Sequence, residues 1–229
     1  RTSGLPVAGH LTCVGASKAE TLEVADSFAE IGVTDIVALR GDPENGAPTF
    51  TPHADGFADS VELIEALAKT GKFTLRVGAY PEPHPESHDQ AQNVEWLKRK
   101  FDAGADEAIT QFFFETETFL RFRDACAAAG ITKTITPGIM PVTNWKSARN
   151  FATRCGASVP AALDEAYAAA IRDDRHDLLS TALCTEMCSE LVSEGVENLH
   201  FYTLNRPELT RAVCRALGVT AQTSLSDVA

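Results

Sequence analysis

The stretch DIVALRGDP at residues 35–43 decides the fold class of this chain. Its apolar, partly β-branched run predicts a buried strand over Asp35–Arg40. Near-continuous apolar runs of this kind are typical of parallel strands, which helices cover on their faces. The strand leads directly into Gly41 and Asp42, so the sequence places a cation and a carboxylate where the core opens.

The same pattern repeats on both sides of this stretch. Short apolar segments alternate with longer segments of helical periodicity, which predicts parallel strands joined by helical crossovers. The predicted strands are His10–Val14, Asp35–Arg40, Thr74–Ala79, Glu107–Phe114, Thr134–Ile139 and Asn198–Thr203. The predicted helices are Lys18–Ile31, Asp59–Thr70, Ala91–Ala103, Thr118–Ala129, Asn144–Arg154, Asp177–Ser193 and Pro207–Leu217. Left-handed C-caps are predicted at Gly32, Gly71, Gly104, Gly130 and Gly195.

Six strand–helix units do not close the common parallel barrel, which has eight strands. An open doubly wound sheet would normally carry a glycine-rich phosphate loop after its first strand, and the sequence has none there. We therefore expect a (β/α)8 barrel whose first two units, about 60 residues at ~30 residues each, lie ahead of Arg1. Residues 1–229 then form a single domain, with a frayed polar tail over residues 220–229.

Composition and charge exclude several classes of partner. Hydrophobic residues make up 44% of the chain and charged residues 23%, which is ordinary for a folded globular protein. The net charge of −12 argues against nucleic acid, although it leaves room for a local anion site. Since no apolar run approaches the ~20 residues of a membrane span and no signal peptide is visible, we expect no membrane partner and a cytoplasmic protein.

The six cysteines include no CxxC pair. We expect reduced and mostly buried thiols. Cys184 and Cys188 are one helical turn apart, which could suit a metal, but no histidine or carboxylate motif joins them. Packing is favoured roughly ten to one over a metal site, so no metal is expected.

Barrel geometry nominates the ligand groups, because these come from the carboxyl ends of the strands and the loops that follow. At Arg40-Gly41-Asp42, Gly41 would let a ligand approach the backbone while Asp42 polarises a heterocycle. An arginine–aspartate pair that merely caps the strand is about equally compatible with the sequence.

Three further segments follow predicted strands. The proline-rich loop at 80–85 presents Tyr80 and His84 stiffly, which suits a preorganised site, although a solvated histidine on a rigid turn is the alternative. Gln111 can both donate to and accept from an amide-bearing ring. The cation run at 98–100 is either a solvated face or an anion site.

Seven segments together resemble the methylenetetrahydrofolate reductase family. They are HLTC at 10–13, ALRGDP at 38–43, AYPEPHPE at 79–86, LKRKFDAGA at 97–105, ITQFFF at 109–114, PGIMPV at 137–142 and HFYTLNR at 200–206. They occur in the family's order and with similar spacing, from His10 to about Leu217. The resemblance therefore covers nearly the whole chain.

The resemblance implies a (β/α)8 barrel that binds FAD at the carboxyl ends of its strands. It also implies ping-pong reduction of methylenetetrahydrofolate to 5-methyltetrahydrofolate, with NADH or NADPH as the co-substrate and a homo-oligomeric assembly. The residues that match FAD-binding positions are His10, Leu39, Arg40, Gly41, Asp42, Ala58, Tyr80, His84, Asn93, Arg99 and Lys100. The family usually has an acidic residue where this chain has Asn93. Arg99 and Lys100 would face the phosphates.

The same resemblance implies roles in catalysis and substrate binding. Asp42 would lie near the flavin and the pterin and stabilise the cationic form of the opened folate, and Gln111 would hydrogen-bond the ligand stacked on the flavin. Phe151, Tyr202 and Arg206 match positions close to the substrate, with Arg206 as a partner for the folate's anionic tail.

One departure from the family lies at the front of the sequence. Family members carry a phenylalanine-rich first strand with a general-acid glutamate, which this sequence lacks. Glu20 and Glu23 are predicted on a helix away from the strand ends, so we expect the acid to precede Arg1. A ferredoxin-linked one-carbon reductase and a non-catalytic flavin-binding subunit are the alternative functions.

Overall fold

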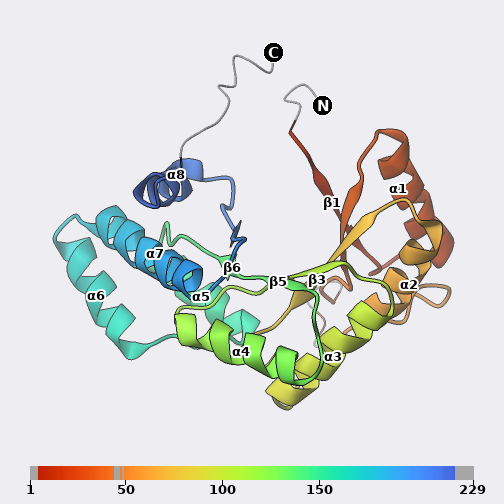
Figure 1. The fold of residues 1–229 in the computed structure, drawn as a ribbon, viewed down its shortest axis with the longest axis horizontal. Helices are drawn as coiled ribbons and strands as arrows, with labels where there is room; N and C mark the ends of the chain where they lie inside the picture. Colours follow the sequence, from red (N-terminus) through yellow and green to blue (C-terminus); the bar gives the residue numbers. More distant parts are fainter. Residues whose placement is uncertain (1–4, 44–46, 48, 220–229) are drawn as a thin grey trace.

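The computed structural model describes residues 5–43, 47 and 49–219, and it has an α/β architecture built on parallel strands (Figure 1). The strands are β1 (Ala8–Thr12), β2 (Asp35–Leu39), β3 (Thr74–Ala79), β4 (Glu107–Thr110), β5 (Thr134–Thr136), β6 (Gly138–Ile139) and β7 (His200–Phe201). β1 to β5 form one sheet in chain order and β6 pairs with β7, all in parallel. The predicted parallel α/β class is confirmed, and the predicted tail at 220–229 lies outside the described residues.

The helices follow one another around an arc outside the strands (Figure 1). They are α1 (Lys18–Glu30), α2 (Ser60–Thr70), α3 (Gln90–Asp102), α4 (Thr116–Ala128), α5 (Trp145–Cys155), α6 (Ala161–Arg172), α7 (His176–Ser193) and α8 (Pro207–Ala216). None of the helices in the described part of the chain combines the length and apolar character needed to cross a bilayer. The five predicted glycine C-caps are confirmed, since all have a positive φ.

Two strands were predicted with the wrong bounds, and one helix was missed. The strand predicted to reach Phe114 ends at Thr110, because the backbone turns there into a loop that presents Gln111. The strand predicted over Thr134–Ile139 is divided at Pro137, which has no N–H for a ladder, and continues as β6 on a different partner. Helix α6 was missed although its alanine-rich sequence favours a helix, because the strand–helix alternation requires only one helix between neighbouring strands.

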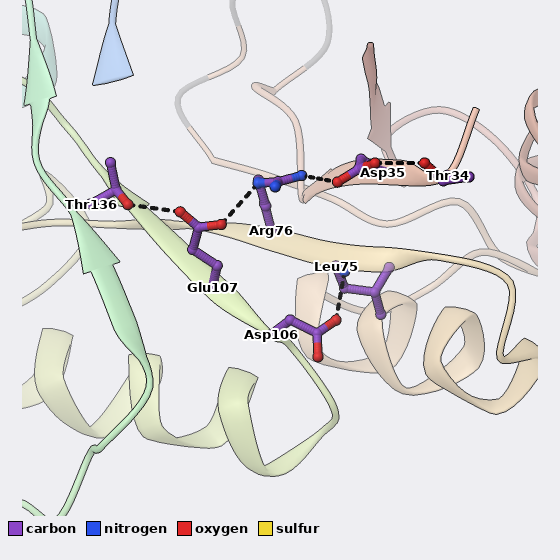
Figure 2. Close-up of polar contacts among 7 residues, drawn as sticks. All are labelled: Thr34, Asp35, Leu75, Arg76, Asp106, Glu107 and Thr136. Atoms are coloured by element: carbon purple, nitrogen blue, oxygen red, sulfur yellow. Dashed lines mark hydrogen bonds and ion pairs between the residues drawn. The ribbon is translucent and has the colours of Figure 1, made fainter. Parts of the chain in front are cut away.

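Side chains alternate between two faces of the sheet. One face packs on the helices and forms the core, with Ile36, Leu75, Val77 and Ala108 among its fully buried members. The opposite face lines the inside of the curved sheet and carries polar groups. Near the amino ends of the strands, Arg76 pairs there with both Asp35 and Glu107 (Figure 2).

This inner polar layer links four adjacent strands. Arg76 Nε lies 3.0 Å from Glu107 Oε2, and Thr136 Oγ1 donates to Glu107 Oε1 at 2.7 Å. At the other end of the layer Asp35 accepts a hydrogen bond from Thr34 Oγ1 at 2.7 Å (Figure 2). The Arg76 guanidinium and the Thr34 hydroxyl lower the pKa of Asp35. The layer fixes the strands that present the loops at their other ends.

Candidate ligand-binding site at the carboxyl ends of the strands

Loops from two neighbouring strands bring four of the predicted site residues together. Arg40 and Asp42 follow β2, and Tyr80 and His84 follow β3. Burial raises the pKa of Tyr80, and the charges of Arg40 and Asp42 also act on that hydroxyl. Burial lowers the pKa of His84, which also responds to the charge of Arg40. The four side chains are therefore close enough to form one site.

Gly41 gives this site an open backbone. Its φ is +92°, and a Cβ there would lie 2.5 Å from Val14 Cγ1 and 3.2 Å from Thr12 Cβ. A side chain would be both strained and in collision, so the position requires glycine. The backbone between the arginine and the exposed Asp42 is consequently free of any side chain, which fits the close approach of a ligand.

The Tyr80–His84 loop is held from two sides. The rings of Tyr80 and His84 meet edge to face with their centroids 4.5 Å apart. The buried Asn93 on α3 donates through Nδ2 to Tyr80 O at 3.2 Å and Glu82 O at 2.7 Å. The amide of Asn93 thus supports the loop that carries two predicted cofactor residues, a contact that an acidic side chain could make only if protonated.

Lys100 is a buried cation with spare donors. It is 7% exposed, and its Nζ donates to Gly78 O at 2.7 Å. Burial, together with the positive charge of Arg40, lowers the pKa of Lys100 to about 8, although the charge of Asp59 opposes this shift. Lys100 forms no ion pair with the carboxylates of the described residues. A buried ammonium with two unused N–H groups fits an anionic ligand such as a phosphate.

Gln111 after β4, Phe151 on α5 and Tyr202 after β7 border the same region. Gln111 follows β4, and its Oε1 accepts from Phe112 N at 3.1 Å, which leaves its amide NH2 available. Phe151 on α5 packs on Phe112 with ring centroids 5.3 Å apart. Tyr202 follows β7 and donates its hydroxyl to Thr110 O at 2.9 Å. Burial raises the pKa of Tyr202 to about 12, and Tyr80 adds to that shift.

Five other predicted site residues form none of the contacts described above. Arg99 is exposed and stacks over Trp96 at 4.3 Å, on a different side of α3 from Lys100. His10 faces the inner polar layer, where its charge acts on His200. Leu39 lies at the end of β2, where its side chain would be 3.6 Å from a Cβ built on Gly78. Ala58 is exposed before α2, and Arg206 is exposed at the start of α8. Arg206 forms no ion pair with the described residues.

Sequence reasoning missed two residues that organise the site. Glu86 binds the Arg40 guanidinium through both carboxylate oxygens, with Nη2 to Oε1 at 3.0 Å. The buried Thr110 accepts from Gly138 N at 2.9 Å through Oγ1 and from the Tyr202 hydroxyl through its carbonyl. The AYPEPHPE segment contained Glu86, and the need of Arg40 for a counter-charge was the signal that could have identified it.

The arrangement can bind a ligand that combines an anionic part and a flat polar ring. Lys100 supplies the cation, Arg40 and His84 supply directed N–H groups, and Gln111 and Phe151 supply an amide and an aromatic face. The exposed Asp42, which forms no ion pair with the described residues, is available beside them as a carboxylate. No predicted site residue lines the cavity of about 340 Å³ between α4, α6 and α7.

Comparisons with known proteins show the family of this chain. The profile of the family described as Methylenetetrahydrofolate reductase matches residues 1–218. A 5,10-methylenetetrahydrofolate reductase of Pectobacterium carotovorum is 43% identical over 219 residues, covering 95% of this chain and 71% of the relative. The enzyme of the same name from Escherichia coli K12 is 41% identical, covering 95% and 72%.

Two more distant matches extend the comparison. A rice protein called "Probable methylenetetrahydrofolate reductase (NADH)" is 34% identical, covering 95% of this chain and 39% of the relative. Among solved structures, an uncharacterized Clostridium thermocellum protein, described as binding two copies of 5-methyl-5,6,7,8-tetrahydrofolic acid, aligns with a TM-score of 0.51 over 93% of each chain. At 13% identity this structure supports a likeness of fold alone.

Proposed function

Because this chain belongs to the methylenetetrahydrofolate reductase family, we propose that it reduces 5,10-methylenetetrahydrofolate to 5-methyltetrahydrofolate with FAD as its cofactor and NADH or NADPH as its electron donor. The observation that carries this proposal is the convergence of Arg40, Asp42, Tyr80, His84 and Lys100 at the carboxyl ends of the strands. The name of the rice relative includes NADH, which favours that donor.

The residues present fit FAD. Lys100 is buried with spare donors and no ion pair in the described part of the chain, as a phosphate-binding lysine would be. Gly41 leaves the backbone beside Arg40 uncovered, and His84 presents a second directed donor. When bound, the flavin supplies the hydride relay between the nicotinamide and the folate. Leu39, Ala58, His10, Asn93 and Arg99 complete the proposed cofactor residues.

The chain's own residues then have separate tasks in the reaction. Gln111 orients the ligand through its free amide, and Phe151 offers that ligand an aromatic face. The Asp42 carboxylate stabilises a cationic folate. Tyr202 borders the site, and Arg206, at the start of α8, would pair with the anionic tail of the folate. One pocket serves both substrates in turn.

The family's barrel and assembly belong to the same proposal. Parallel strands that pair in chain order, inside an arc of helices, support an eight-stranded (β/α) barrel (Figure 1). We also infer a homo-oligomer in the cytoplasm, to be checked by size-exclusion chromatography with light scattering. Neither Glu20 nor Glu23 is proposed as the general acid. The carboxylate of Glu20 closes the capping box of α1 with Ser17, and Glu23 lies exposed on the same helix.

The spectrum of the purified protein tests the proposal. We expect a yellow flavoprotein that is bleached anaerobically by NADH or NADPH and reoxidised by methylenetetrahydrofolate. A protein that neither binds FAD nor oxidises a nicotinamide would refute the proposal, and reduction by ferredoxin alone would replace the electron donor.

The Asp42→Asn variant tests the role of Asp42. We expect it to retain flavin and to slow only the half-reaction with folate, because the charge of Asp42 acts on the cationic folate. Stopped-flow measurement of both half-reactions checks this result. An equal loss in both would instead indicate a general role of Asp42 in binding.

A further inference from the structure

We propose that Glu86 is a positioning residue that fixes the Arg40 guanidinium at the cofactor site, so that Arg40 acts as a directed hydrogen-bond donor and Lys100 acts as the counter-charge for phosphate. This inference rests on the proposed function, because it assigns a role within the same FAD site. It concerns a residue that lies two positions after His84 and 46 after Arg40.

Arg40 is held on three sides. Its two Nη atoms donate to the two carboxylate oxygens of Glu86, and its Nε donates to Gly41 O at 3.3 Å. The Phe50 ring lies against the guanidinium, 4.7 Å from Cζ to the ring centroid. A planar guanidinium with these contacts has one orientation, and two of its five N–H groups remain for a ligand.

Glu86 also orients His84, through its main chain. The backbone N–H of Glu86 donates to His84 Nδ1 at 3.1 Å. Since Nδ1 is an acceptor, a neutral His84 carries its proton on Nε2, which leaves that N–H to donate to a ligand. One residue thus connects the loops after β2 and β3. A side-chain substitution at Glu86 removes the contact with Arg40 and the carboxylate charge that acts on His84, whereas the backbone hydrogen bond to His84 stays.

The charges at the site explain the division of tasks. The Glu86 carboxylate neutralises Arg40, and the Arg40 hydrogen bond lowers the pKa of Glu86 while raising the pKa of Arg40. The pair therefore persists as an ion pair with no net charge. Lys100 has no such partner in the described part of the chain, so it is the cation left for a phosphate. Arg40 contributes direction instead of net charge.

FAD titration of the full-length apoprotein tests this role, with flavin fluorescence as the readout. We compare the wild type with Glu86→Gln, Glu86→Asp, Arg40→Gln and the double variant Arg40→Gln/Glu86→Gln. The matched control is Glu65→Gln, which removes a glutamate whose 2.9 Å ion pair with Lys69 is exposed on α2. Circular dichroism and urea unfolding establish that each variant is folded.

The expected result is a loss that depends on Arg40. Glu86→Gln weakens FAD binding roughly three- to tenfold, a modest loss because the pair is partly solvated, and Glu65→Gln leaves binding unchanged. Glu86→Asp keeps the charge and recovers part of the affinity. In the Arg40→Gln background the same Glu86→Gln change has less than about a twofold effect, because its target is already gone.

Two results would overturn the inference. One is a Glu86→Gln variant that binds FAD as tightly as Glu65→Gln, and the other is a full additional loss in the Arg40→Gln background, which would indicate a structural role unrelated to Arg40. If Glu86→Gln does not fold, Glu86→Asp decides by the same cycle. A wild type that binds no FAD refutes the proposed function itself, which distinguishes the two failures.

Discussion

At the amino ends of β2, β3 and β4 the charged side chains bind one another, whereas at the carboxyl ends of these strands two charges have no ion pair within the described chain. Arg76 lies between Asp35 and Glu107 in the inner polar layer (Figure 2). Lys100 and Asp42 have no comparable partner at the other end. Satisfied charges fix the strands, and unsatisfied charges remain for a ligand. The two ends should therefore respond differently to substitution.

Removing the buried cation should give the largest effect. Replacing Lys100 with methionine removes charge-assisted hydrogen bonds worth about 3 kcal/mol, so we expect FAD to bind roughly 100-fold more weakly. The apoprotein should lose little stability, because an apolar side chain of similar length replaces a buried charge. FAD titration and urea unfolding measure the two quantities. Lys69→Met, on the exposed face of α2, is the control and should bind FAD normally. Normal FAD binding by Lys100→Met would contradict the idea that the charges at the carboxyl ends of the strands are kept for a ligand.

The titration of Lys100 should also make the free energy of unfolding depend on pH. The pKa of Lys100 is lowered from 10.5 to about 8 in the folded protein. Between these values the unfolded chain holds a proton that the folded chain has released, so the free energy of unfolding rises with pH. The total rise is on the order of 3 kcal/mol. Urea unfolding of the apoprotein from pH 7.5 to 10.5 should show this rise in the wild type relative to Lys100→Met. Parallel curves for the two proteins would contradict it.

Substitution at the amino ends of the strands should have the opposite effect, lowering stability and leaving FAD binding nearly unchanged. In Arg76→Gln, the half-buried carboxylates of Asp35 and Glu107 lose their shared cation, so we expect the free energy of unfolding to fall by about 2 kcal/mol. FAD affinity of the folded protein should stay within about twofold, since the layer lies away from the proposed ligand groups. Arg121→Gln, which breaks an exposed pair at 3.8 Å, should cost less than about 0.5 kcal/mol. A large loss of FAD affinity in Arg76→Gln would show that the two ends are coupled.

The strands and the loops at their carboxyl ends could be predicted from the sequence, because both have local sequence signals. The apolar run ending in Arg40-Gly41-Asp42 predicted a strand, which is confirmed, and a site, and barrel geometry then nominated Tyr80, His84 and Gln111. The inner polar layer was not predictable in the same way. Arg76 joins carboxylates 41 and 31 residues away, and only the strand register brings them together. Long-range pairing has no local sequence signature.

The cation run shows the same limit at the level of single residues. Arg99 and Lys100 are adjacent in sequence and were expected to act together. Neighbouring residues on a helix point in different directions. Lys100 is therefore buried and donates to Gly78 O, whereas Arg99 stacks on Trp96. Asn93 likewise could be recognised as unusual, but its support of the Tyr80–Glu82 loop required the packed structure.

Two glycine substitutions, one at the proposed site and one away from it, should have smaller effects on FAD binding. Gly41→Ala introduces a Cβ at a φ of +92° into contact with Val14, and Gly71→Ala does so at a φ of +64° with no neighbour within 4 Å. Gly71→Ala should cost about 1–2 kcal/mol of stability, because it forces a side chain into the left-handed region, and Gly41→Ala should cost more, because its Cβ also collides with Val14. Only Gly41→Ala should also weaken FAD binding, by roughly tenfold, since it displaces the loop of the site. Equal FAD affinities in the two variants would contradict the role of Gly41.

The smallest expected effect concerns Tyr202, whose hydroxyl is already occupied. It donates to Thr110 O, and a pKa raised to about 12 keeps it protonated at any working pH. Tyr202→Phe should therefore lower the free energy of unfolding by about 1 kcal/mol and leave the KM for folate within about twofold, because the aromatic ring remains. Steady-state kinetics beside urea unfolding separates the two effects. A large rise in KM would show that the hydroxyl leaves Thr110 to bind the substrate, and Tyr202 would then belong with Lys100 among the groups kept for a ligand.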